Sequence, residues 1–109
     1  MAAVGDVWRL RCEGRVVAEL HVTQMDMPWI RARVERLAGF EAFAPLYAED
    51  IRLLETLEEE AAEWSAHYDL IEGATQLLYP DGTEVPEYLL HIDGDEARWR
   101  RHHEPFQEH

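Results

Sequence analysis

Three side chains with metal-binding and acid–base chemistry lie at alternate positions near the end of the chain: His91, Asp93 and Asp95. In a β-strand, alternate residues share a face, so this spacing could direct one imidazole and two carboxylates toward a single ion. That donor set suits manganese, iron or zinc, with a fourth ligand supplied from elsewhere, for example by His21, Asp26 or Glu96. A small metal-binding protein or a metal-dependent enzyme is therefore one hypothesis.

The glycine inside this triplet supports a different interpretation. Gly94 favours a turn over Asp93-Gly94-Asp95, which would end a strand at Asp93 and let Asp95 cap a following helix. His91 would then be a solvent-facing strand residue. We favour this structural interpretation, and we assign no catalytic residue.

The charge of the chain is its most distinctive property. The net charge is −13, and residues 41–97 contain sixteen acids against one basic residue, Arg52. Such a field disfavours nucleic acid and anionic membranes and would attract a basic protein. The predicted binding surface comprises Glu55, Glu58, Glu59, Glu60, Glu63, Trp29 and Trp99. The simpler alternatives are a solvated acidic surface and two core tryptophans.

Length and composition restrict the class of protein. A chain of 109 residues with 47% apolar content is expected to form a single domain. Neither a signal peptide nor an apolar run of membrane-spanning length is visible, so we predict a cytoplasmic protein. Cys12 is the only cysteine, which excludes an internal disulfide and predicts a small buried side chain. Motifs for phosphate binding, nucleophilic serine or zinc-protease chemistry are absent, so an enzyme is the less favoured class.

Two β-hairpins are predicted. In the first, Trp8 and Leu10 alternate with charged residues before Gly14, and a three-residue loop over 13–15 would pair Trp8 with Leu20. In the second, Pro80-Asp81-Gly82 forms the turn and Tyr79 pairs with Thr83. Beyond that turn, Tyr88, Leu90 and Ile92 form the inward-facing set.

Helices are predicted to connect and cover these hairpins. A short helix is expected within 26–39, where Ile30, Val34 and Leu37 would share one face. A long apolar stripe over 45–72 predicts either one helix or two, with a possible second start at Thr56. The fold prediction is α+β: a four-stranded antiparallel sheet covered on one face by this long helix, with a short helix after each hairpin.

The segments "DMPW", "GFE", "PLYAEDIRLLE", "PDGTEVPEYLLHIDGDEA" and "EPF" resemble those of small single-domain proteins of unassigned function from high-GC Gram-positive bacteria. The resemblance implies a bacterial cytoplasmic protein and brings no activity or cofactor. Our leading hypothesis is a non-enzymatic regulatory, inhibitory or immunity-like module that binds a basic protein. A homodimer formed through an exposed sheet edge, and a ligand cavity near Trp8, Trp64, Tyr68 and Tyr88, remain open alternatives.

Overall fold

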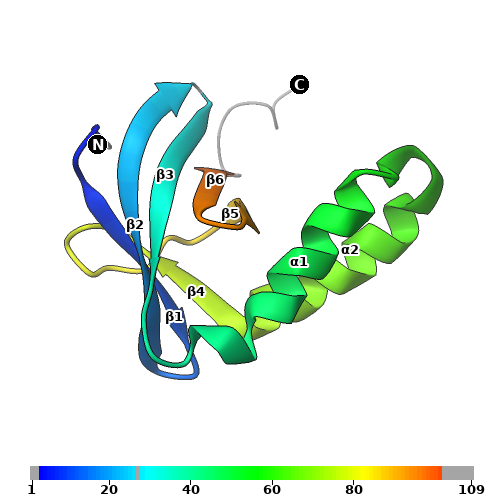
Figure 1. Cartoon of the computed structure of the whole chain (residues 1–109), viewed down its shortest axis with the longest axis horizontal. Helices are drawn as coiled ribbons and strands as arrows, with labels where there is room; N and C mark the ends of the chain where they lie inside the picture. The colour runs from blue at the N-terminus through cyan, green and yellow to red at the C-terminus, as the bar shows by residue number, and fades with distance from the viewer. Residues whose placement is uncertain (1–2, 27, 102–109) are drawn as a thin grey trace.

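The protein is an α+β domain in which a curled antiparallel sheet carries a projecting pair of helices (Figure 1). The computed structural model describes residues 3–26 and 28–101. The sheet has six strands in the order β4-β1-β2-β3-β6-β5 and curls into a half-barrel. The strands are β1 (Val7–Cys12), β2 (Arg15–Asp26), β3 (Trp29–Arg36), β4 (Thr75–Leu78), β5 (Tyr88–Asp93) and β6 (Glu96–Arg101). The α+β class is confirmed, and the prediction of four strands is wrong.

The first hairpin has the predicted register but a shorter loop. Trp8 pairs with Leu20 and Leu10 with Ala18. Between Leu10 and Arg11 the register shifts, so that Cys12 pairs with Arg15 and only two residues remain in the turn. Both of these residues, Glu13 and Gly14, have positive φ, as a two-residue hairpin turn of this hand requires. The odd residue that keeps the apolar side chains of the two strands on one face therefore lies in a β-bulge, and not in the loop as predicted.

The short helix expected within 26–39 is strand β3 in the structure. Its side chains alternate: Ile30, Ala32 and Val34 are buried, while the residues between them point to the outer face. β3 pairs with β2 on one side and with β6 on the other, so its burial is that of a central strand. The 3₁₀ helix η1 (Phe40–Ala42) follows, and Gly39 adopts positive φ immediately before it.

The segment Glu96–Arg101 is also a strand. Asp93 pairs with Glu96 across a two-residue turn in which Gly94 has a φ of 65°. The turn predicted over Asp93-Gly94-Asp95 is therefore confirmed, whereas the helix predicted after it is wrong. The side chains of β6 alternate between the two faces of the sheet, with Ala97 and Trp99 buried in the core.

The turn over residues 80–82 forms as predicted, but the second predicted hairpin extends only a few residues on each side of it. The amide of Tyr79 donates to the carbonyl of Thr83, and the amide of Val85 donates to the carbonyl of Leu77. After Val85 the chain leaves β4, and the next strand, β5, pairs with β6. β4 and β5 thus become the two edges of the sheet.

Tyrosine hydroxyl groups satisfy backbone groups at both edges. The Leu90 amide of β5 donates to Tyr68 Oη over 2.7 Å, and the Leu77 amide of β4 donates to Tyr88 Oη over 3.2 Å. Tyr88 also donates to the carbonyl of Thr75. Because Tyr88 belongs to β5 and Leu77 to β4, this side chain bridges the two edges of the half-barrel. The core lies inside the curl, around Trp8, Leu20 and Trp99.

The predicted helical stretch is two helices, α1 (Ala44–Leu54) and α2 (Leu57–Ala74), which lie side by side and project from the sheet (Figure 1). α1 lies close to β5. Tyr68 and Ile71 of α2 are buried near the sheet, whereas Leu57 and Leu70 are exposed. None of the described helices is both long and apolar enough to cross a membrane.

Candidate functional site

The three residues proposed as metal ligands from their spacing do not converge in the structure. His91 is buried, whereas Asp93 and Asp95 are exposed, and Asp95 lies in the turn between β5 and β6. They do not form a group with ligand atoms close enough for one ion, as judged over the described residues. The prediction that His91 faces solvent is wrong, because helices α1 and α2 cover it.

Asp50 is the side chain that His91 meets instead. Asp50 lies on α1 and is completely buried, with Oδ2 2.6 Å from His91 Nδ1 on β5. Its other oxygen, Oδ1, accepts a hydrogen bond of 2.7 Å from Trp64 Nε1 on α2. One carboxylate thus joins α1, α2 and the edge strand of the sheet. Because a carboxylate accepts hydrogen bonds and does not donate them, His91 Nδ1 carries the proton in this arrangement.

Aromatic rings surround the His91 imidazole. The rings of Trp29, Trp64 and Tyr68 have centroids 6.0, 6.4 and 6.2 Å from it. Only 4% of the His91 side chain is exposed. An Asp–His pair of this geometry can orient an imidazole for acid–base work, but so closed an environment leaves no room for a substrate beside it. The contacts support a structural role, in which this buried network fixes the helices to the sheet.

The two tryptophans assigned to a binding surface have different environments. Trp99 is fully buried in the core, 5.1 Å from the Trp8 ring, so its assignment to a surface is wrong. Trp29 is half-buried on the outer face of the sheet. The guanidinium carbons of Arg98 and Arg100 lie 5.9 and 5.8 Å from its ring centroid, which are cation–π distances.

The predicted acidic surface lies mainly on α2. Glu58, Glu59 and Glu63 are exposed on this helix, and Glu55 is exposed just before it. The side chain of Glu60 lies outside the part of the molecule that is described. Helical spacing places Glu59 opposite Trp64, Tyr68 and Ile71, which pack toward α1 and the sheet. Glu58 and Glu63 lie on the two sides of Glu59, away from this inner stripe.

Three of these carboxylates on α2 have no cationic partner among the described residues. Glu58, Glu59 and Glu63 form no ion pair with any described residue, and Arg52 of α1 contacts Glu49 of the same helix at 2.6 Å. Hydrogen bonding to Arg52 lowers the pKa of Glu49. Within the described structure, Glu58, Glu59 and Glu63 therefore present negative charge that no neighbouring cation offsets.

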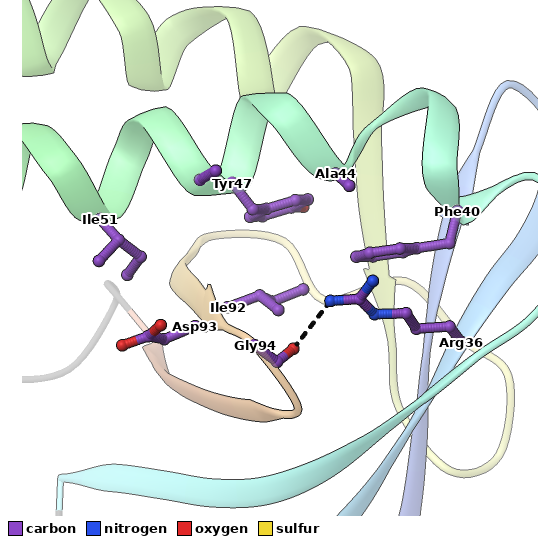
Figure 2. A pocket seen from close by; sticks show the side chains of 9 residues that line it. Arg36, Phe40, Ala44, Tyr47, Ile51, Ile92, Asp93 and Gly94 are labelled. Carbon is purple, nitrogen blue, oxygen red and sulfur yellow. Dashed lines mark hydrogen bonds between the residues drawn. The ribbon is translucent and has the colours of Figure 1, made fainter.

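A small hollow lies between α1 and the turn that joins β5 to β6 (Figure 2). It measures about 250 Å³ and is lined by Phe40, Tyr47, Ile51 and Ile92, with Arg36 at one end and Asp93 at the other. Arg36 donates to the carbonyl of Gly94 and stacks on the Phe40 ring, so contacts within the protein already engage its guanidinium. None of the four aromatic residues suggested for a ligand cavity lines this hollow.

A cluster that could hold a metal ion lies on the outer face of β2 and β3. Glu19, His21 and Glu35 each place one ligand atom within 4.8 Å of the other two, and no other trio of His, Cys, Asp and Glu does so in the described ranges. His21 was considered only as an additional ligand from the sequence. The cross-strand position of Glu35 depends on β3, which was predicted to be a helix.

Sequence reasoning also missed Asp50. A signal was present, because Tyr47, Asp50 and Leu53 are spaced by three residues and are the buried side chains of α1. An acid in line with apolar residues on a helix indicates a buried partner. That partner is 41 residues away, on a strand whose outer face was assigned to solvent.

No family model, no curated protein and no solved structure matches this chain. The function must therefore be inferred from the contacts, burial and charge of the chain itself.

Proposed function

We propose that the protein is a non-enzymatic binding module whose acidic α2 face associates with a basic protein. The observation that carries this proposal is the group of exposed carboxylates on α2 that have no cationic partner within the described structure. Uncompensated charge of one sign speeds the association of an oppositely charged partner and disfavours partners of like charge.

The same face offers apolar contacts between its charges. Ala62, Ala66 and Leu70 are exposed and follow one another at intervals of four residues, so they form one stripe along α2. Leu70 is 61% exposed. Glu59 and Glu63 share this side of the helix. A partner would therefore combine basic side chains with an apolar group that covers Leu70.

The attachment of α2 supports its use as a preformed surface. Trp64 bonds to Asp50, and Tyr68 bonds to the backbone of β5. His67 Nε2 lies 2.8 Å from the carbonyl of Leu46 on α1. All three side chains lie on the inner side of the helix, so they hold it in place while the acidic side remains free. A surface that is already ordered loses less conformational entropy when it binds.

The proposal is tested by affinity capture at low salt from the cells that produce the protein, with three immobilised baits. The first is the native chain. The second carries Glu58→Gln, Glu59→Gln and Glu63→Gln on α2. The third is a control with the same change in net charge elsewhere: Glu13→Gln, Glu87→Gln and Asp95→Asn, all at exposed positions outside the helices.

We expect at least one basic protein to be retained by the native chain and the control, and to be lost from the α2 variant. Equal capture by the α2 variant and the control would show that only total charge matters, which contradicts a defined acidic face. Circular dichroism melting of each bait verifies that all three are folded.

A further inference from the structure

We propose that Glu19, His21 and Glu35 form a binding site for a divalent transition-metal ion of the zinc class on the outer face of the sheet. The site is separate from the acidic face of α2 and does not depend on the function proposed for that face. It also differs from the His91, Asp93 and Asp95 triplet that the sequence suggested.

The strand register brings the three side chains together. Glu19 and His21 are two residues apart on β2 and therefore share a face. Glu35 on β3 is directly opposite Glu19. Two carboxylates in directly opposed positions repel each other and destabilise a strand pair. A cation between them would convert this repulsion into attraction.

The distances between the ligand atoms suit a metal ion better than direct hydrogen bonds. His21 Nε2 lies 3.4 Å from Glu19 Oε1 and 3.2 Å from Glu35 Oε1. A charge-assisted hydrogen bond would be about 2.7–2.9 Å long. In a tetrahedral zinc site with bonds of about 2.0–2.1 Å, neighbouring ligand atoms are about 3.3 Å apart. The two separations from His21 Nε2 are close to the edges of such a tetrahedron, and the two carboxylate oxygens lie within 4.8 Å of each other.

The imidazole nitrogen at the centre of this cluster lacks a hydrogen bond. His21 Nε2 is shielded from solvent and has no hydrogen-bond partner in the described structure. A buried polar atom without a partner is unfavourable. Coordination of an ion by Nε2 would remove this cost, since the neutral imidazole nitrogen is a zinc ligand.

The surroundings predict the character of the bound ion. Three protein ligands leave one tetrahedral position for water or an external anion, which is the coordination of an open zinc site. Arg33 is directly opposite His21, and Arg9 Nε lies 3.9 Å from Glu19 Oε2. These guanidinium groups weaken the local attraction for a cation, so we expect micromolar rather than nanomolar affinity. They also favour an anion as the fourth ligand.

The test is a titration of the full chain with zinc chloride by isothermal calorimetry, in a buffer that does not chelate zinc. Because histidines at 102, 103 and 109 could bind zinc themselves, every sample carries His102→Gln, His103→Gln and His109→Gln. We expect about one equivalent of zinc to bind to this parent protein. His21→Gln and Glu35→Gln should each weaken binding at least about tenfold. Glu96→Gln, an exposed carboxylate on a neighbouring strand, is the matched control and should bind as the parent does.

Cobalt(II) gives a second readout, because tetrahedral coordination produces intense visible absorption bands. The parent and Glu96→Gln should show these bands, and the other two variants should lose them. The proposal is overturned if the parent does not bind zinc at 100 μM, or if His21→Gln and Glu35→Gln both bind with the affinity of the parent.

Discussion

Removal of the Asp50 carboxylate is the strongest perturbation that the structure predicts. In Asp50→Ala, His91 Nδ1 and Trp64 Nε1 both lose an acceptor, at 2.6 and 2.7 Å, while His91 remains buried and Trp64 partly buried. A hydrogen bond to a charged group contributes about 1.5–3 kcal/mol. We therefore expect the free energy of unfolding to fall by about 3–6 kcal/mol, a large part of the total for a domain of this size.

Urea unfolding followed by tryptophan fluorescence and far-ultraviolet circular dichroism measures this loss. With a urea dependence of about 1.5 kcal/mol per molar, the midpoint should fall by about 2–4 M. Asp50→Asn keeps one acceptor oxygen, so its loss should be about half as large. Asp93→Ala removes an exposed carboxylate from β5 and should change stability by less than about 0.5 kcal/mol. A loss in Asp50→Ala below about 1 kcal/mol would refute the role assigned to this network.

Three further predictions concern the sheet and core. Burial, together with the charge of Glu13, raises the pKa of Cys12 to about 11, so Ellman's reagent at pH 8 should react far more slowly with the folded protein than with the protein in urea; equal rates would contradict this burial. Burial likewise raises the pKa of three tyrosines, so above about pH 10 the unfolded chain loses protons first and stability falls as pH rises. These tyrosines are Tyr47, Tyr68 and Tyr88. Absorbance at 295 nm should show that they ionise only when the protein unfolds, and their ionisation in the folded protein would contradict the raised pKa values. Gly94→Ala should lower stability by about 1 kcal/mol, because its φ of 65° strains any residue with a Cβ, and unchanged stability by urea titration would argue against this turn.

Local signals predicted the turns and the first hairpin well. Glycine at position 14, Pro80-Asp81-Gly82 and the glycine at position 94 each act through backbone preferences of one or two residues, and all three turns form. The interruption near Thr56 was also visible as one of two alternatives. Such features depend on neighbours in the sequence and can be inferred without knowledge of the fold.

The errors arose where two periodicities coincide. Ile30 and Val34 are four residues apart, a spacing that fits one face of a helix and also one face of a strand. The apolar residue between them, Ala32, is consistent with the strand, but Asp26 as a cap and Pro28 in the first turn favoured a helix start. Pairing with β2 and β6 decides the outcome. The segment over residues 96–101, which was also predicted to be a helix, becomes β6 by pairing with β3 and β5.

The candidate sites depended on these long-range pairings. The acidic helix surface could be predicted because it follows from composition and helical spacing alone. The burial of His91 required α1 and α2 to pack against β5, and the approach of Glu35 to Glu19 required β3 to be a strand. The residues that neighbour His91 and Glu35 in the sequence do not indicate either of these long-range contacts.

The rate of association with a captured partner, measured at increasing ionic strength, tests the proposed function most directly. For the native chain, we predict that the association rate constant falls steeply between 25 and 250 mM salt, because screening shortens the reach of the acidic α2 face. The variant with Glu58→Gln, Glu59→Gln and Glu63→Gln should associate slowly at low salt and show a shallow dependence. The same salt dependence for both proteins would contradict the claim that this face binds the partner.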